Sequence, residues 1–311
     1  MLDLLIVGRP LDFILRRLQE EFRVTVVPEG ARPRDLLPER RAAVDAVACI
    51  GGGAVPAEDI AALPNLRVIA NFGAGYDRID VSAARARRIQ VSYLPGVTAT
   101  CVADHAFALL LAAARGIVAG QRHVESGAWI ERRFPLMHRV AGRRLGIYGL
   151  GAIGREAAKR AQGFDMPVGY HNRRPADVPY RYFPTLRELA AWADVLLVAC
   201  PATEETKGTV DAIVLEALGP EGLLVNIARG SIVDEDALVA ALDARRIAGA
   251  ALDVVAVEPS RPQHLIGRDD VVLTPHVAGG THETWRDATE RLAANLSAFA
   301  RTGSVLDPVP E

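Results

Sequence analysis

Short apolar runs alternate with segments of helical periodicity along nearly the whole chain. Such runs predict buried strands, and their alternation with helices is typical of parallel α/β sheets. In the first third of the chain a helix is predicted at Leu11–Phe22. The predicted strands there are Leu4–Val7, Val24–Val27, Ala46–Ile50, Arg67–Ala70 and Gln90–Ser92.

A second series of strands follows an Ala- and Leu-rich helix that runs from Cys101 to about Arg115. The tail from about Glu283 to Ala300 is also predicted to be helical, with Leu292, Leu296 and Phe299 on one face. We expect it to return to the first sheet, which would leave a cleft between two lobes for a ligand. The strands of the second series are Arg144–Tyr148, Val168–Tyr170, Asp194–Ala199, Leu223–Ile227, Ala250–Val254 and Val271–Thr274.

The bulk composition narrows the class of protein. A length of 311 residues favours two domains, and a net charge of −2 argues against a nucleic-acid partner. Cys49, Cys101 and Cys200 lack metal-ligand spacing, so we expect no metal and a reducing compartment. The apolar N-terminus lacks a preceding basic region, and the longest apolar run, Ala106–Ala114, is too short to span a bilayer. We therefore expect a cytoplasmic protein without a membrane partner.

The first strand of the second series runs into the sequence Gly149-Leu150-Gly151-Ala152-Ile153-Gly154, and a helix is predicted from Arg155 to about Gln162. Gly149 permits a sharp turn, Gly151 permits close approach of a pyrophosphate, and Gly154 permits tight helix–strand packing. The helix N-terminus favours an anion. Strand, G-x-G-x-x-G turn and helix together predict a dinucleotide site.

The end of the next strand indicates which dinucleotide binds. NAD sites usually place a carboxylate about 20 residues beyond the glycines to bind the ribose hydroxyls. This chain has His171 and Asn172 there, followed by Arg173 and Arg174. Guanidinium groups bind a 2′-phosphate through charge-assisted bonds, so we predict a preference for NADPH over NADH of about ten- to a hundredfold. A solvated basic turn is the alternative interpretation.

Arg229, Glu258 and His276 follow three strands of the second series. Ligands of open α/β sheets bind beyond the carboxyl ends of strands, so these residues form a candidate active site. Arg229 suits a carboxylate anchor, His276 a proton donor, and Glu258 a partner that orients the imidazole. Each residue also has a purely structural interpretation. His276 could be an ordinary loop residue, Arg229 could start a helix, and Glu258 could lie in a solvated turn.

These residues resemble the D-isomer-specific 2-hydroxyacid dehydrogenase family, and the resemblance covers nearly the whole chain. Phe134–Leu136 and His171–Arg174 resemble its glyoxylate/hydroxypyruvate reductases, including the hydroxyphenylpyruvate-reducing branch. The matching blocks are Asn71–Asp77, Pro95–Val97, Val102–Asp104, Gly149–Gly154, Val225–Gly230, Ala251–Val254, Glu258–Pro259 and Thr274–His276.

The resemblance implies an α/β fold of two open parallel-sheet domains. A Rossmann coenzyme domain, residues 98–283, is inserted into a flavodoxin-like substrate domain, residues 1–97 and 284–311. It also implies a homodimer, with catalysis by Arg229, Glu258 and His276. The main-chain amides of Ala74 and Gly75 would bind the substrate carboxylate. Further residues expected beside the cofactor are Cys200, Pro201, Ile227, Ala228, Asp253, which would hold the nicotinamide amide, and Gly279.

The function predicted from residues and resemblance is reduction of a short 2-keto acid, such as glyoxylate or hydroxypyruvate, by NADPH. One alternative is a dehydrogenase that prefers NADH and acts on another substrate. A second is a dinucleotide-sensing corepressor, because such proteins can retain the same catalytic set. Trp129, Leu136 and Met137 lie in a segment that in relatives reaches toward a neighbouring subunit, and ordinary interface packing explains them equally well.

Overall fold

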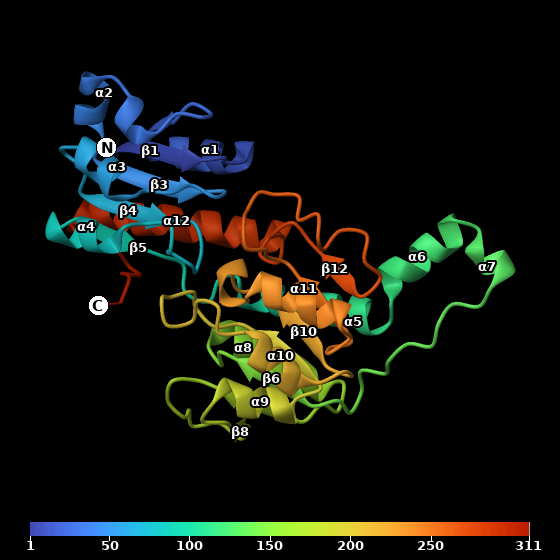
Figure 1. Ribbon diagram of the computed structural model, residues 1–311. Helices are drawn as coiled ribbons and strands as arrows, with labels where there is room; N and C mark the ends of the chain where they lie inside the picture. The colour runs from blue at the N-terminus through green and yellow to red at the C-terminus, as the bar shows by residue number, and fades with distance from the viewer. Residues whose placement is uncertain (311) are drawn as a thin grey trace. The chain divides into compact units, whose positions relative to one another are not determined.

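The computed structural model describes residues 1–310, and its chain divides into two compact units (Figure 1). Unit one contains residues 1–98 and the residues from Thr281 onward. Unit two is the continuous segment Ala99–Gly280. Each unit is built on its own parallel sheet.

Unit one has a five-stranded sheet in the order β2-β1-β3-β4-β5, with every pair of neighbouring strands parallel. This is the flavodoxin-like strand order that the family resemblance implies. Its strands are β1 (Asp3–Gly8), β2 (Arg23–Val26), β3 (Ala46–Ile50), β4 (Val68–Asn71) and β5 (Gln90–Ser92). Its helices are α1 (Asp12–Gln19), η1 (Pro33–Asp35), α2 (Pro38–Ala43), α3 (Ala57–Ala62), α4 (Val81–Ala86) and α12 (His282–Thr302).

The two faces of this sheet carry separate hydrophobic cores. Apolar side chains of α1 and α12 pack on one face, and those of α3 and α4 contribute to the core on the other. Leu292, Leu296 and Phe299 of α12 are buried against the first of these faces, which confirms the apolar face predicted for the tail. The predicted helix Leu11–Phe22 is shorter in the structure, Asp12–Gln19, although Phe22 is buried in the same core.

Unit two has a seven-stranded parallel sheet in the order β12-β11-β10-β9-β6-β7-β8. The chain order reverses between β6 and β9, which is the switch point of a Rossmann sheet. Its strands are β6 (Leu145–Tyr148), β7 (Val168–His171), β8 (Arg181–Tyr182), β9 (Val195–Val198), β10 (Leu223–Asn226), β11 (Gly249–Leu252) and β12 (Val271–Leu273). The predicted α/β class, with two parallel sheets, is confirmed.

Helices cover both faces of the second sheet, so alternate residues of each strand enter different cores. Val195 and Leu197 of β9 face the core formed with α5 and α8, whereas Leu196 and Val198 face the core formed with α9, α10 and α11. Burial on both faces explains why these strands are continuous apolar runs. The helices of unit two are α5 (Ala99–Ala114), α6 (Ile117–Glu125), α7 (Ala128–Glu131), α8 (Ala152–Gln162), α9 (Leu186–Trp192), α10 (Ala212–Leu218), η2 (Gly230–Ile232) and α11 (Glu235–Asp243).

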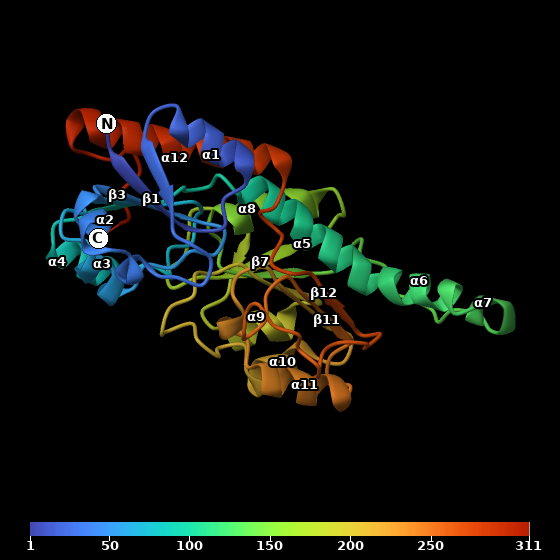
Figure 2. The same ribbon diagram turned by 90° about the horizontal axis from the view of Figure 1, so that it is seen from above.

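Two helical features differ from the sequence prediction. Helix α8 begins at Ala152 rather than Arg155, because the glycine turn leads directly into the first helical turn. Helices α6 and α7 follow α5 as an arm that extends from the remainder of unit two (Figures 1 and 2). Among residues 1–310 no single helix meets the length and apolarity needed to cross a membrane, and only the bent pair α5 and α6 passes that test together.

Candidate active site

Loops at one edge of the seven-stranded sheet carry most of the predicted site residues. The carboxyl ends of parallel strands meet at this edge. The glycine turn follows β6, the arginine pair follows β7, and Cys200 follows β9. Arg229 follows β10, Glu258 follows β11, and His276 follows β12. Strand topology thus assembles residues that lie far apart in the chain.

Glu258 and His276 form a hydrogen-bonded pair between the loops after β11 and β12. Glu258 Oε2 lies 2.6 Å from His276 Nδ1, and Glu258 Oε1 accepts the Val255 N–H at 3.0 Å. Burial raises the pKa of Glu258, but hydrogen bonds from His276 and Val255 and the charges of His276 and Arg229 outweigh it, so the pKa is lowered overall. The ionised carboxylate accepts a hydrogen bond from Nδ1–H, which leaves Nε2 as the nitrogen that can face a ligand.

Arg229 is held by a loop that the buried side chain of Asn226 organises. Asn226 Nδ2 donates to the Arg229 carbonyl at 2.9 Å, and Asn226 Oδ1 accepts the Ala228 N–H at 3.0 Å. This loop also contains Ile227 and meets the loop after β11 very closely. A Cβ on Gly230 would lie 2.0 Å from the Val255 carbonyl oxygen, so glycine is required for the approach.

Asp253 is 1% exposed and organises the loop that carries His276. Its Oδ1 accepts the Thr274 hydroxyl at 2.6 Å and the Val277 N–H at 2.9 Å, and its Oδ2 accepts the Ala278 N–H at 2.9 Å. Its carbonyl accepts the His276 N–H at 2.8 Å. His276 adopts a left-handed φ of 55°, and Gly279 continues the same loop. The structure therefore places the Asp253 carboxylate on main-chain amides of this loop.

The glycine turn has the shape that a pyrophosphate requires. A Cβ on Gly149, whose φ is +100°, would lie 2.5 Å from the Cys200 backbone, and one on Gly154 would lie 2.4 Å from the Gly149 carbonyl oxygen. A Cβ on Gly151 would meet nothing within 4 Å. Open space therefore adjoins the N-terminus of α8, where Gly151 provides no side-chain cap. Backbone amides beside open space suit the phosphates of a dinucleotide.

The loop after β7 holds this turn and presents positive charge. Asn172 Oδ1 accepts the Leu150 N–H at 2.7 Å, so its amide restrains the glycine turn. The Arg173 side chain is 92% exposed and has one guanidinium nitrogen 3.9 Å from Glu205 Oε2, and Arg174 is also exposed. Both guanidinium groups are accessible to an anionic ligand.

Cys200 and Pro201 follow β9 directly beside the glycine turn. Burial raises the pKa of the Cys200 thiol to about 12, so the thiol is neutral at physiological pH. Its proximity to Gly149 makes it a packing neighbour of the turn rather than a charged ligand for the cofactor.

Ala74 and Gly75 belong to unit one, where they follow β4 at the carboxyl edge of the five-stranded sheet. Asn71 Nδ2 donates to the carbonyls of Gly73 at 3.0 Å and Gly75 at 2.9 Å, which fixes this loop. The same arrangement occurs at Asn71, Asn172 and Asn226. Each lies at or just beyond the end of a strand, and its side-chain amide hydrogen-bonds the backbone of the following loop or the glycine turn. Only Asn172 was among the predicted site residues.

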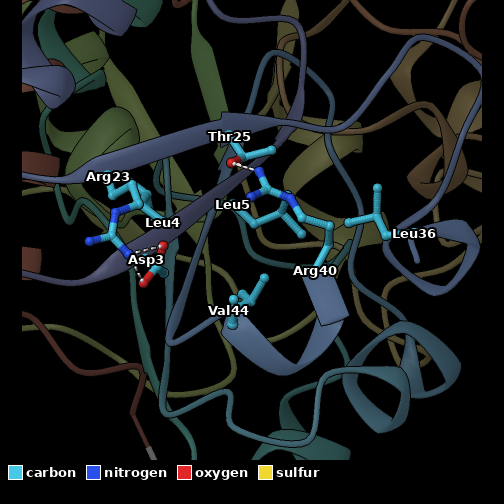
Figure 3. A pocket seen from close by; sticks show the side chains of 9 residues that line it. Asp3, Leu4, Leu5, Arg23, Thr25, Leu36, Arg40 and Val44 are labelled. Atoms are coloured by element: carbon cyan, nitrogen blue, oxygen red, sulfur yellow. Dashed lines mark hydrogen bonds and ion pairs between the residues drawn. The ribbon is translucent and has the colours of Figure 1, made fainter. Parts of the chain in front are cut away.

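One hollow in each unit lies away from the predicted catalytic residues. The pocket in Figure 3 lies between β1, β2 and α2 of unit one, where Arg40 donates to Thr25 at 2.6 Å. Its volume is about 10 Å³, which is room for one water. An open hollow of about 400 Å³ in unit two lies beside the C-terminus of α5, near Met137 and Phe164. Residues 1–310 contain no group of three or more His, Cys, Asp or Glu arranged to hold a metal.

Comparisons with known proteins show the family to which the chain belongs. The family model of the D-isomer specific 2-hydroxyacid dehydrogenase, NAD binding domain, matches residues 107–278. Glyoxylate/hydroxypyruvate reductase A of Arabidopsis thaliana is 42% identical over 299 residues, covering 96% of each protein. Hydroxyphenylpyruvate reductase of Plectranthus scutellarioides is 38% identical over 298 residues, covering 96% of this chain and 95% of the relative.

A similar solved structure is the NADPH-dependent glyoxylate/hydroxypyruvate reductase of Sinorhizobium meliloti in complex with NADP and malonate. It matches with a TM-score of 0.93 and 39% identity, covering 99% of this chain and 96% of that one. The chain belongs to the D-isomer-specific 2-hydroxyacid dehydrogenase family, and it is an enzyme of that family.

The close approach at Gly230 yields a test of the site's architecture. We expect Gly230→Ala to lower the free energy of unfolding by about 1–3 kcal/mol, because the new methyl meets backbone atoms that cannot yield. Urea unfolding followed by tryptophan fluorescence measures this. Gly163→Ala is the matched control, since its Cβ would lie 3.5 Å from the nearest atom, the Arg160 carbonyl oxygen. Equal stability of the two variants would contradict the tight loop contact.

Proposed function

We propose that the chain reduces a short 2-keto acid, such as glyoxylate or hydroxypyruvate, to the D-2-hydroxy acid with NADPH as reductant. The observation that carries this proposal is the 2.6 Å pair of Glu258 and His276 beside the Arg229 loop. Similarity to the glyoxylate/hydroxypyruvate reductases of Arabidopsis and Sinorhizobium supports the substrate class. Unit one would supply substrate contacts through Ala74 and Gly75, and unit two would hold the dinucleotide.

Three side chains share the chemistry in this proposal. Arg229 binds the substrate carboxylate with its planar guanidinium group. His276 donates a proton from Nε2 to the keto oxygen, while Glu258 accepts a hydrogen bond from Nδ1–H and fixes the orientation of the ring. A reduced nicotinamide, when bound, would supply the hydride that the keto carbon accepts. The proton and hydride together convert the carbonyl into a hydroxyl group, and the product leaves with its carboxylate unchanged.

The residues around the glycine turn fit a phosphorylated dinucleotide. The N-terminus of α8 and the open space at Gly151 would receive the pyrophosphate. Arg173 and Arg174 would bind the ribose 2′-phosphate, and a carboxylate that would repel it is missing from the end of β7, where His171 and Asn172 stand. Asn172 and Cys200 would fix the turn, with Pro201, Ile227, Ala228, Asp253 and Gly279 around the nicotinamide half.

The arm formed by α6, α7 and the segment after them supports a homodimer. Its apolar side chains are unusually exposed: Trp129 is 69%, Ile130 92% and Leu136 94% exposed. Apolar residues gathered on one arm mark an interaction surface, and a second copy of the chain is the occupant that the family implies.

Replacement of His276 by Asn tests the catalytic assignment. Asparagine cannot supply the proton, so we expect kcat for glyoxylate or hydroxypyruvate to fall by about 10²–10⁴-fold. Binding of NADPH, measured by fluorescence titration, should stay within about twofold because His276 lies outside the phosphate site. Near-normal turnover of the variant would refute His276 as the donor. Failure of the wild-type protein to reduce any 2-keto acid in a panel would refute the function itself.

The cofactor assignment is tested with the double variant Arg173→Ala/Arg174→Ala. Loss of two charge-assisted bonds should raise the KM for NADPH by at least about tenfold and leave the KM for NADH unchanged. Arg187→Ala, which removes an exposed arginine from α9, is the control for net charge. Equal effects on both cofactors, or no preference for NADPH in the wild type, would contradict the 2′-phosphate site.

The dimer is tested by Ile130→Glu on α7. The new carboxylate would be buried without a partner in the dimer interface, so we expect the variant to be a monomer. Light scattering after gel filtration should show twice the chain mass for the wild type and the mass of one chain for the variant. Ile213→Glu on α10, where Ile213 is 58% exposed, is the matched control. A dimer that survives Ile130→Glu, or a monomeric wild type, would contradict this interface.

A further inference from the structure

Helix α5 carries one imidazole that the catalytic scheme above does not use. His105 Nε2 lies 2.9 Å from Thr274 Oγ1 and 3.4 Å from Asp253 Oδ1. The His105 side chain is 22% exposed, and α5 packs against β10, β11 and β12. The one acidic residue of this helix, Asp104, pairs with Arg160 at 2.6 Å. His105 therefore reaches from an otherwise apolar helix to the base of the His276 loop.

The hydrogen bonds around Thr274 have a single direction. Thr274 Oγ1 donates its one proton to Asp253 Oδ1 at 2.6 Å. Toward His105 the same oxygen must then accept, so Nε2 of His105 carries a proton. The result is a chain of donors from His105 through Thr274 to the Asp253 carboxylate.

The Asp253 carboxylate at the end of this chain controls the geometry of His276. It accepts the N–H groups of Val277 and Ala278, the two residues that follow the histidine. The Asp253 carbonyl accepts the N–H of His276 itself, whose backbone holds a left-handed φ of 55°. A rotation of the carboxylate would release both amides and let the loop relax away from that conformation.

We propose that His105 is a positioning residue for His276, acting through Thr274 and Asp253. His105 fixes the rotamer of the Thr274 hydroxyl, and this hydroxyl aligns the Asp253 carboxylate. The aligned carboxylate holds the loop that presents the His276 imidazole. The expected effect on turnover rests on the proposed function. The expected effect on the position of His276 rests on the hydrogen-bond geometry alone. A misplacement of about 1 Å in a catalytic group lowers rates by up to about 10²-fold, so the effect is measurable.

Kinetics of paired variants test this inference. We expect His105→Leu and Thr274→Val to lower kcat by about tenfold while the KM for NADPH stays within about twofold, because the phosphate site is untouched. His105→Gln, which keeps an N–H donor at similar reach, and Thr274→Ser, which keeps the hydroxyl, should each retain at least about half of kcat. His138→Leu, a half-buried imidazole paired with Glu221 instead, is the control.

Two kinetic outcomes would overturn the inference. Unchanged kcat in His105→Leu would show that the donor chain does not position His276. Equal loss in His105→Leu and His105→Gln, with a matching loss of thermal stability, would show that the imidazole contributes packing alone.

Ring-nitrogen NMR of ¹⁵N-histidine-labelled protein tests the same network without turnover. We expect a protonated Nε2 at His105, and we expect the His276 ring signals to move in His105→Leu and return to their wild-type positions in His105→Gln. Unmoved His276 signals in His105→Leu would overturn the inference. If the wild type reduces no 2-keto acid, the proposed function fails, and these signals still decide whether His105 positions His276.

Discussion

The hydrogen bond between Glu258 Oε2 and His276 Nδ1 decides which nitrogen of the imidazole can meet a ligand. Because the pKa of Glu258 is lowered, its carboxylate is ionised and accepts a hydrogen bond from Nδ1–H, which leaves Nε2 as the ring nitrogen that can face a ligand. Two further contacts hold the loops that carry these two side chains and Arg229. The backbone contact at Gly230 brings the Arg229 loop against the loop of Glu258, and Asp253 holds the loop of His276.

A parallel sheet provides the common edge, but buried polar side chains fix the loops on it. Asn226 and Asp253 are 0% and 1% exposed, and both hydrogen-bond main-chain groups of the following loops, with Asp253 also accepting the Thr274 hydroxyl. Asn172 does the same for the glycine turn. Buried polar atoms are costly unless they are bonded, so these hydrogen bonds stabilise one loop conformation over others. A site built this way is arranged before substrate arrives, which lowers the reorganisation needed for hydride and proton transfer.

The sequence was sufficient for the features that depend on local pattern. Apolar runs located the principal strands of both sheets, because burial on both faces requires continuous hydrophobicity. Residue type and position after a strand selected Glu258 and His276, which the structure brings to 2.6 Å. Helices α6 and α7 were not predicted, because their apolar residues, such as Ile130, are exposed and do not form the buried face expected of a helix in a single chain. Asn226 and His105 escaped because their partners are backbone groups or side chains that only the fold brings near, and a polar residue next to an apolar run does not identify its partner.

The central claim is that His276 presents Nε2 to the keto oxygen while Glu258 holds Nδ1. A crystal structure of the protein with NADP⁺ and oxamate, a 2-keto acid analogue that hydride does not reduce, tests this most directly. The account predicts Nε2 within about 3 Å of the oxamate carbonyl oxygen, with the Arg229 guanidinium on the carboxylate. A ternary complex in which the imidazole points away from oxamate, or in which Nδ1 faces it and Glu258 is released, would contradict the account.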